Sequence, residues 1–410
     1  MMKFIKPYLT HLYSQNHAGN GQEYLTHLFK IMKSQLTIIF GVTLAGMDVV
    51  KLTSELVNIG SDSSGTGEKE IAKYISGYLD ERGIASEITQ FEKGRCNVVA
   101  VIGKGERLLL NGHIDTVPIG DPKKWRYGTE AKIIGDKMYG RGTSDMKGGV
   151  ASILTSLPDP EKVKKGLVLT FVADEERLFR GSTWLLTKRK DLFKGVRYGI
   201  IAEPTDLKIQ IAQKGIMDIH ITVKGKSAHA SRPWLGRSAI VDMSRFVLGL
   251  EKLSKNFKVK DRMLGTGTLN AGTIRGGVAP NVVPDYCEID LDRRLVPGED
   301  EKMVVSQIKS VMKELKIDYD MDVKKSRPPF ALDQQSFLPK FMGKFVPVEY
   351  TSAPGYTEAE LYKSLGNIDC VVYGPGDKEV IHKENECVSV QSLYTSQKYF
   401  TKIISAWCQS

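Results

Sequence analysis

The sequence predicts an α/β protein in which a layered sheet domain is interrupted by a smaller, ferredoxin-like α+β domain. Three observations carry this prediction. At 410 residues, the chain is too long for one compact hydrophobic core. Helix-sized segments alternate with short apolar strands in residues 47–213 and again after Pro328-Pro329. Between these parts, the pattern changes to strand, helix, two strands, helix and strand, which is the ferredoxin-like order.

The first part contains one clear amphipathic helix and four buried strands. Residues 68–82 carry apolar side chains at helical spacing, among them Ile71, Ile75 and Leu79. Short apolar runs come next, several of them separated by helix-sized segments, and they indicate strands of a layered sheet. We expect these strands at 97–102, 107–111, 167–172 and 198–202.

The interrupting domain is predicted over residues 214–325. Its first strand, 216–223, alternates apolar and polar side chains, as a half-buried strand does. The sheet domain is therefore expected in two parts, 47–213 and 326–410. The remaining elements of the interrupting domain are expected as a helix at 236–253, strands at 268–275 and 286–296, a helix at 299–315 and a strand at 317–323.

Residues 1–46 differ in composition from the rest of the chain. They hold three of the seven histidines, no arginine and a single acidic residue, Glu23. The apolar run at 36–46 is shorter than the roughly 20 residues needed to span a bilayer. We expect a non-essential extension, and a signal peptide is the alternative.

Cysteine content and charge narrow the class of protein. The five cysteines are scattered and form no C-x-x-C pair, which disfavours a disulfide framework or a thiolate zinc site and favours a reducing cytoplasm. The net charge of +10 is spread along the chain without a dense basic block. We therefore expect neither a nucleic-acid nor a membrane partner, and the charge reflects either a basic proteome or a general attraction for anionic substrates.

Polar groups gather where the predicted strands end. A lone histidine after a strand is usually structural, and an acidic pair is usually a solvated turn. Here five separate segments bring such groups to the carboxyl edge of one sheet, which is where α/β proteins form their ligand crevice. The groups are His113, Asp145, the pair Glu175-Glu176, Glu203 and His382.

These residue types suit a dinuclear metal site. Carboxylates that converge repel one another unless cations neutralise them. Neutral imidazole and carboxylate together are good ligands for Zn²⁺. Two metals a few ångström apart need a bridging carboxylate, and Asp145 is the natural candidate. Asp115, two residues after His113, could accept the spare N–H of a metal-bound imidazole.

Seven motifs in order carry a family resemblance: GHIDTVP, GRGTSDMKGG, ADEE, AEPT, GKSAHASRP, APNVVPD and the late His382. From residue 47 to the C-terminus, the chain resembles the acetylornithine deacetylase and succinyl-diaminopimelate desuccinylase family of dinuclear metallohydrolases, which also holds aminoacylases and some carboxypeptidases. The resemblance implies a zinc-peptidase-like catalytic domain and a homodimer formed through the inserted domain. It also implies two divalent ions, Zn²⁺ first, with Co²⁺ or Mn²⁺ as alternatives.

The resemblance assigns the metal ligands residue by residue. It implies that His113 and Glu203 bind one metal, that Glu176 and His382 bind the other, and that Asp145 bridges them.

The remaining roles also come from the resemblance. Asp115 would orient His113, and Glu175 would be the general base that takes a proton from an activated water. His229 would reach into the partner subunit's site to stabilise the oxyanion. Asn281 and Arg294 would lie near the substrate carboxylate. The residues alone leave an alternative open for each of two positions. His229 could be a solvated loop residue, and Arg294 could form a surface ion pair with neighbouring aspartates.

The predicted function is removal of an acyl group from an N-acyl amino acid, of the acetylornithine or succinyl-diaminopimelate type. Glutamate at position 203 resembles the deacetylase and desuccinylase branch of the family, whereas aspartate is common at this position in aminoacylases and carboxypeptidases. The segment from Gly355 to Glu358 approaches the substrate and departs from the Gly-Thr-Asp stretch of relatives, which leaves the substrate open. A metal-dependent dipeptidase or carboxypeptidase is the alternative. A non-catalytic metal-binding scaffold would require loss of Glu175 or a ligand, and none is lost.

Overall fold

The computed structural model describes residues 48–63 and 67–410. The extension expected at 1–46 lies outside the described residues, so its status stays a prediction. Within the described part of the chain, no helix is long and apolar enough to cross a membrane. The cytoplasmic location stays a prediction as well.

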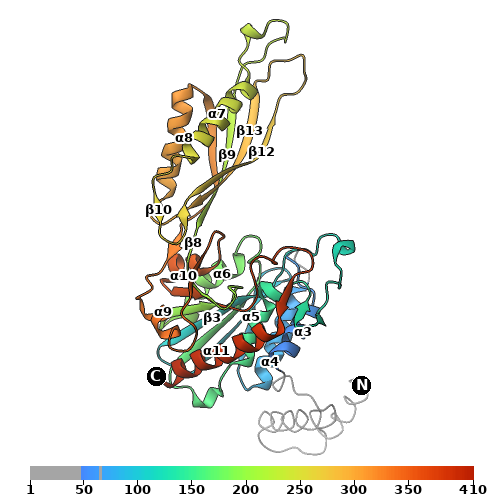
Figure 1. The fold of residues 1–410 in the computed structure, drawn as a ribbon, viewed down its shortest axis with the longest axis vertical. Helices are drawn as coiled ribbons and strands as arrows, with labels where there is room; N and C mark the ends of the chain where they lie inside the picture. The colour runs from blue at the N-terminus through green and yellow to red at the C-terminus, as the bar shows by residue number, and fades with distance from the viewer. Residues whose placement is uncertain (1–47, 64–66) are drawn as a thin grey trace, which may run out of the picture. The chain divides into compact units, whose positions relative to one another are not determined.

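A nine-stranded mixed sheet forms the larger layer (Figure 1). Its order is β1-β2-β6-β3-β7-β17-β8-β15, and β16 pairs with β8. The central strands β6, β3, β7 and β17 are parallel, so their carboxyl ends meet at one edge. The strands are β1 (Ser86–Glu92), β2 (Arg95–Ile102), β3 (Arg107–His113), β6 (Gly166–Val172), β7 (Val196–Ile201), β8 (Ile209–Gln213), β15 (Phe330–Ala331), β16 (Tyr350–Ala353) and β17 (Asp369–Val372).

Helices bury this sheet on both faces, which explains the continuous apolar runs of its central strands. Every residue of β6 is buried. Leu109 packs in one core cluster with Leu361 and Tyr362 of α10, whereas Gly112 faces Val150 of α5 on the other side. The helices are α3 (Val49–Asn58), α4 (Glu68–Glu81), α5 (Gly148–Thr155), α6 (Arg180–Lys188), α9 (Phe337–Met342), α10 (Ala359–Gly366) and α11 (Val390–Gln409).

The smaller sheet has the predicted ferredoxin-like content. Its order is β12-β13-β9-β14, and α7 and α8 pack on one of its faces (Figure 1). Alternate residues of β9, such as Met217 and Ile219, join the core beneath these helices. Side-chain caps at Ser238 and Asp300 begin the two helices. The elements are β9 (Gly215–Lys224), α7 (Ala239–Ser254), β12 (Thr268–Gly276), β13 (Tyr286–Leu295), α8 (Glu301–Leu315) and β14 (Asp318–Arg327).

The fold class is therefore confirmed, and each predicted strand or helix is present with ends displaced by a few residues. The domain boundaries at 213/214 and 325/326 stay predictions. Sequence patterns did not predict two small sheets, because their strands are only two or three residues long. These are β4 (Lys132–Ile134), β5 (Lys137–Tyr139) and β18 (Cys387–Ser389) in one, and β10 (Lys260–Asp261) with β11 (Gly265–Thr266) in the other.

Candidate metal centre and substrate cavity

The five predicted metal ligands meet at the carboxyl edge of the large sheet. They form two groups of three that share Asp145, and within each group the potential ligand atoms lie within 4.8 Å of one another. The first group is His113, Asp145 and Glu203, and the second is Asp145, Glu176 and His382.

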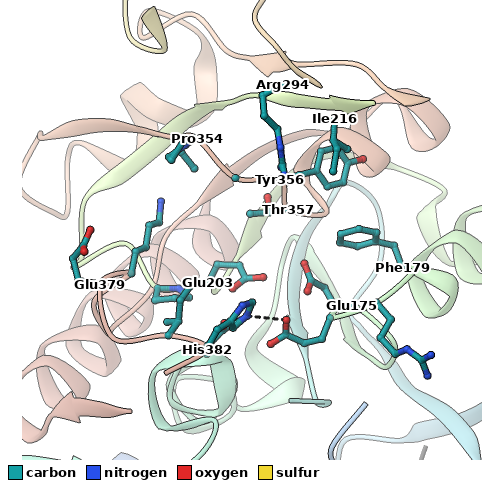
Figure 2. Close-up of a pocket in the computed structure, with 18 of the residues that line it drawn as sticks. Glu175, Phe179, Glu203, Ile216, Arg294, Pro354, Tyr356, Thr357, Glu379 and His382 are labelled. Carbon is teal, nitrogen blue, oxygen red and sulfur yellow. Dashed lines mark ion pairs between the residues drawn. The ribbon is translucent and has the colours of Figure 1, made fainter. Parts of the chain in front are cut away.

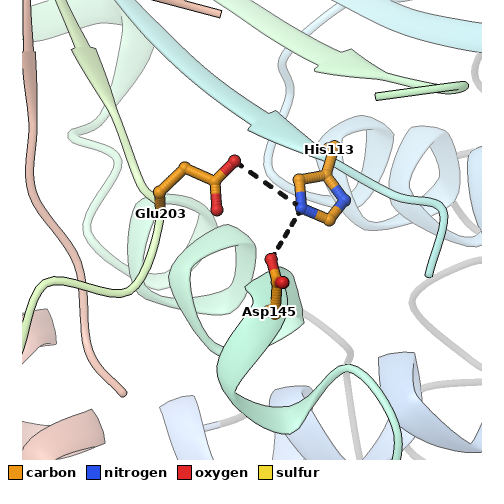
Figure 3. A group of neighbouring side chains, drawn as sticks. All are labelled: His113, Asp145 and Glu203. Atoms are coloured by element: carbon orange, nitrogen blue, oxygen red, sulfur yellow. Dashed lines mark hydrogen bonds and ion pairs between the residues drawn. The ribbon is translucent and has the colours of Figure 1, made fainter. Parts of the chain in front are cut away.

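The first group is buried and converges on one ring nitrogen (Figure 3). His113 ends β3, and its Nε2 atom lies 2.9 Å from Asp145 Oδ1 and 3.7 Å from Glu203 Oε1. Glu203 follows β7, the parallel neighbour of β3. A cation placed between the His113 nitrogen and the two carboxylate oxygens would be bound by all three atoms, in place of their direct contacts with one another.

The second group converges on His382 from the opposite side of Asp145. His382 Nε2 lies 3.1 Å from Asp145 Oδ2 and 2.9 Å from Glu176 Oε2. The other carboxylate oxygen of Glu176, Oε1, is buried and has no hydrogen-bond partner among the described residues. A buried carboxylate oxygen without a donor fits a cation site, because leaving it unpaired is costly.

Two glycines let the Asp145 loop lie against its neighbours. A β-carbon on Gly149 would overlap the carbonyl oxygen of Ala202, the residue before Glu203. A β-carbon on Gly376 would overlap the Ser144 hydroxyl, and Gly376 also has a positive φ of 95°. The close approach at these two positions keeps Asp145 beside both groups.

Glu386 binds the backbone of the Asp145 loop, and sequence patterns did not predict this role. Its Oε1 atom accepts hydrogen bonds from the backbone N–H groups of Gly142, Ser144 and Asp145 at 3.0–3.1 Å. Its Oε2 atom pairs with Arg141 at 2.7 Å. No local pattern marks this role, because the residues involved are more than 240 positions apart.

The carboxylate of Asp115 has a different role from the predicted one. The nearest acceptor to His113 Nδ1 is the backbone oxygen of Asp115 at 2.8 Å, while the carboxylate lies 3.8 Å away. That carboxylate instead accepts the backbone N–H groups of Glu175 and Glu176, both at 3.2 Å. Asp115 thus orients the imidazole through its main chain and the acidic pair through its side chain.

A buried ion cluster supports the loop that carries the acidic pair. Arg95 pairs with Glu68 and, at 2.6 Å, with Asp174, and all three side chains are almost fully buried. Asp174 immediately precedes Glu175, has a positive φ of 67° and also pairs with Arg180 at 2.7 Å. The cluster therefore anchors the start of the turn.

Replacing Arg95 by leucine is expected to lower the free energy of unfolding by about 3–5 kcal/mol, because Glu68 would stay buried without its cation. Urea unfolding followed by circular dichroism measures this loss. Arg189→Leu is the matched control, since its carboxylate partners are exposed and it should cost at most about 1 kcal/mol. Equal losses for the two variants would refute the role of the buried cluster.

The site concentrates negative charge that its histidines alone do not offset. Burial raises the pKa of Glu175 well above its usual value, and the charge of Glu203 raises it further. Burial and the charge of Asp145 raise the pKa of Glu176 to about 6. Hydrogen bonds to Asp145 and Glu176 raise the pKa of His382 to about 10. Divalent cations at the two groups would act against these shifts in the carboxylates and compete with the proton on His382.

A cavity of about 520 Å³ opens over the metal groups (Figure 2). Figure 2 shows Glu175, Glu203 and His382 on one side of the cavity and Arg294 on the other, and Gly355 also lines it. Arg294 lines the cavity and also pairs with Asp292, its Nε atom lying 2.8 Å from Oδ1. The ion pair is therefore present, and the role of Arg294 beside a substrate carboxylate stays a prediction.

Two predicted site residues lie outside the cavity of this chain. His229 is exposed, and its Nδ1 atom lies 2.8 Å from the Ser231 hydroxyl. Asn281 is also exposed and accepts a backbone hydrogen bond from Ala230. A single chain therefore does not bring either side chain to the metal groups.

Most of the chain is similar in sequence to known proteins. The model of peptidase family M20/M25/M40 matches residues 109–406. A probable succinyl-diaminopimelate desuccinylase of Staphylococcus epidermidis is 28% identical over 392 residues, covering 86% of this chain and 96% of the relative. An acetylornithine deacetylase of Aliivibrio fischeri is 29% identical over 355 residues, covering 83% and 92%.

Solved structures share the fold at low identity. The aminopeptidase PepT of Bacillus cereus superposes with a TM-score of 0.72 at 21% identity, covering 87% of this chain and 97% of that one. A dinuclear metal binding peptidase of Bacillus subtilis gives a TM-score of 0.68 at 18% identity, covering 88% and 98%.

Proposed function

This chain belongs to peptidase family M20/M25/M40 and is a hydrolase of amide bonds, and we propose that it removes the acyl group from an N-acyl amino acid. The observation that carries the proposal is the pair of three-residue groups that share Asp145 beneath one cavity. The desuccinylase and deacetylase names of the sequence relatives support deacylation over peptide cleavage.

The donor set fits two divalent ions, with Zn²⁺ first and Co²⁺ or Mn²⁺ as alternatives. His113 and Glu203 would hold one ion, Glu176 and His382 the other, and Asp145 both. Two nitrogen and several oxygen donors suit Zn²⁺, and the unpartnered Oε1 atom of Glu176 supports a cation there. When bound, such ions polarise the scissile carbonyl and lower the pKa of water.

Glu175 is the proposed general base. It lines the cavity beside Glu176 but belongs to neither metal group, so its carboxylate is free to accept a proton from the attacking water. The same carboxylate would then give the proton to the leaving nitrogen. Asp115 keeps the pair in place by accepting both of their backbone N–H groups.

We further propose a homodimer in which His229 acts on the partner subunit's site. The exposed position of His229, outside the cavity of its own chain, supports a role in trans. An imidazolium or neutral N–H donor placed over the carbonyl would stabilise the oxyanion of the tetrahedral intermediate. Asn281 lies in the segment paired with that of His229 and would enter the same site.

The substrate class is tested by one panel of assays. Purified protein with Zn²⁺, Co²⁺ or Mn²⁺ would be given N-acetylornithine, N-succinyl-diaminopimelate, N-acetylated neutral amino acids and dipeptides. We expect kcat/KM to be highest for an N-acyl amino acid. A higher kcat/KM for dipeptides would favour the alternative function, a metal-dependent dipeptidase or carboxypeptidase, and the structural likeness to an aminopeptidase keeps that alternative in the panel.

A further inference from the structure

The segment from Gly355 to Glu358 divides between two environments. Gly355, Tyr356 and Thr357 line the substrate cavity. The side chain of Glu358 does not line it and is completely buried at the start of α10. Because an isolated buried charge is very costly, the partners of Glu358 decide whether its carboxyl group is ionised.

Glu358 lies in a buried polar cluster that joins strands β3 and β6 to helices α6 and α10. Its Oε1 atom accepts a hydrogen bond from the Ser182 hydroxyl, and the Asn111 amide also lies beside the carboxyl group. The amide nitrogen of Asn111 donates to the Thr170 hydroxyl at 3.1 Å and to the Tyr362 hydroxyl at 2.8 Å. All five side chains are fully buried.

This cluster lacks hydrogen-bond donors. Among the described residues, Glu358 Oε2 and Asn111 Oδ1 are buried without a hydrogen-bond partner. The two N–H bonds of the Asn111 amide are already used, and an ionised carboxylate can only accept hydrogen bonds. A proton on Glu358 would turn one of the two unpartnered oxygens into a donor, which lowers the cost of burying them.

The charges around Glu358 also favour a neutral carboxyl group. Within residues 48–63 and 67–410, no lysine or arginine forms an ion pair with it. The ionisable side chains that interact with it are His113, Asp115, Glu175, Glu203, Tyr362 and Cys370. Three of these are carboxylates, which disfavour a further negative charge, whereas the imidazole acts in the opposite direction. Burial raises the pKa of Glu358 to about 7, with a smaller contribution from Asp115.

The cluster lies next to the turn that carries Glu175. Helix α6 begins at Arg180, shortly after Glu175, and Ser182 lies in its first turn. The hydrogen bond between Ser182 and Glu358 therefore ties the start of α6 to the start of α10. A neutral Glu358 adds no charge beside Glu175, whereas an ionised one would raise the pKa of Glu175 further.

We propose that Glu358 is a positioning residue that stays protonated in the working enzyme, holds the Glu175 turn through Ser182 and spares Glu175 an additional neighbouring negative charge. The part that concerns Glu175 rests on the proposed function, which makes Glu175 the general base. The protonated state of Glu358 can be tested without any substrate.

Two substitutions separate the charge of Glu358 from its hydrogen bonds. Glutamine is neutral and offers both an acceptor and a donor, so Glu358→Gln should keep kcat within about threefold of the wild type. Leucine keeps the size but loses the bond to Ser182, so Glu358→Leu should lower kcat about 10- to 100-fold with unchanged metal content. Turnover would be measured on the compound of the assay panel that the wild-type enzyme hydrolyses fastest.

Infrared spectroscopy at neutral pH reports the charge of Glu358 directly. The enzyme is kept metal-loaded, because bound cations would favour the ionised form. The difference spectrum between wild type and Glu358→Gln should contain the C=O band of a protonated carboxylic acid. Glu360→Gln is the matched control, since Glu360 is buried on the same helix but both of its oxygens accept hydrogen bonds, from Ser364 and Tyr356. Its difference spectrum should contain carboxylate bands instead.

The pH dependence of stability gives a second measurement. The folded chain keeps the proton of Glu358 to a higher pH than the unfolded chain does. The melting temperature of the wild type should therefore fall relative to that of Glu358→Gln as the pH rises from about 5 to about 8.5, with metal in excess.

Three outcomes would overturn the inference while the deacylase function stands. These are a carboxylate band for Glu358, a melting-temperature difference that does not change with pH, and equal losses of kcat in Glu358→Gln and Glu358→Leu. If no N-acyl compound of the panel were hydrolysed, the deacylase function would fail, and the infrared spectra would still decide the protonation state of Glu358.

Discussion

Replacing Glu175 by glutamine should lower turnover by at least about 10²- to 10⁴-fold, while both metals and the fold are retained. Glutamine keeps the shape and an acceptor oxygen but cannot take up a proton at neutral pH. Glu175 lines the cavity without belonging to either metal group, so the substitution should leave the ligands in place. Steady-state turnover and metal content by atomic spectroscopy measure the two effects separately.

The adjacent residue provides the matched control. Glu176 lies 2.9 Å from His382 in the second metal group, so Glu176→Gln should reduce the metal content by about one ion per chain. If Glu175→Gln lost metal while Glu176→Gln kept it, the two roles would be reversed. Near-normal turnover in Glu175→Gln would exclude its role as the base.

Replacing His229 by alanine should lower kcat about 10²- to 10³-fold, the range seen when an oxyanion donor is removed. Metal content should not change, because His229 is exposed and lies outside both metal groups of its own chain. Loss of metal in this variant would contradict the assignment.

Mixed dimers test whether His229 acts in trans. His229→Ala and Glu175→Ala subunits, each nearly inactive alone, would be co-expressed with different affinity tags and purified as mixed dimers. One of the two sites would then contain an intact Glu175 and an intact partner histidine, so about half of the wild-type activity per dimer should return. Mixed dimers that stay inactive would show that His229 does not complete the partner's site.

The residues alone sufficed for the fold class, for many of the longer elements and for the five side chains that cluster at the sheet edge, but not for strands β1, β8 and β16. Apolar periodicity differs between helix and strand, so segments such as 68–82 could be located from the residues. Parallel strands end at the same edge, which is why groups as distant in sequence as His113 and His382 could be expected to lie around one residue, Asp145. The assignment of each ligand to one of two metals required the family resemblance as well.

The tertiary structure decided the residues that support these ligands. Glu386 binds a loop more than 240 positions away, and Arg95 anchors the turn before Glu175. No local periodicity encodes such contacts, since they arise when separate elements pack together. The carboxylate of Asp115 illustrates the same limit. Its position two residues after His113 suggested a contact with the imidazole, but the folded turn directs it to the backbone N–H group of Glu175.

Lys325, which lines the cavity, shows the limit of sequence patterns within a single strand. Simple alternation along β14 would place Lys325 on the same face as Val323, beneath the helices. A single inserted residue reverses that assignment, and the pairing of β14 with β9 reveals it. The sequence therefore determined which chemical groups are available at this site. Side-chain direction depended on strand register and long-range packing, which only the folded chain establishes.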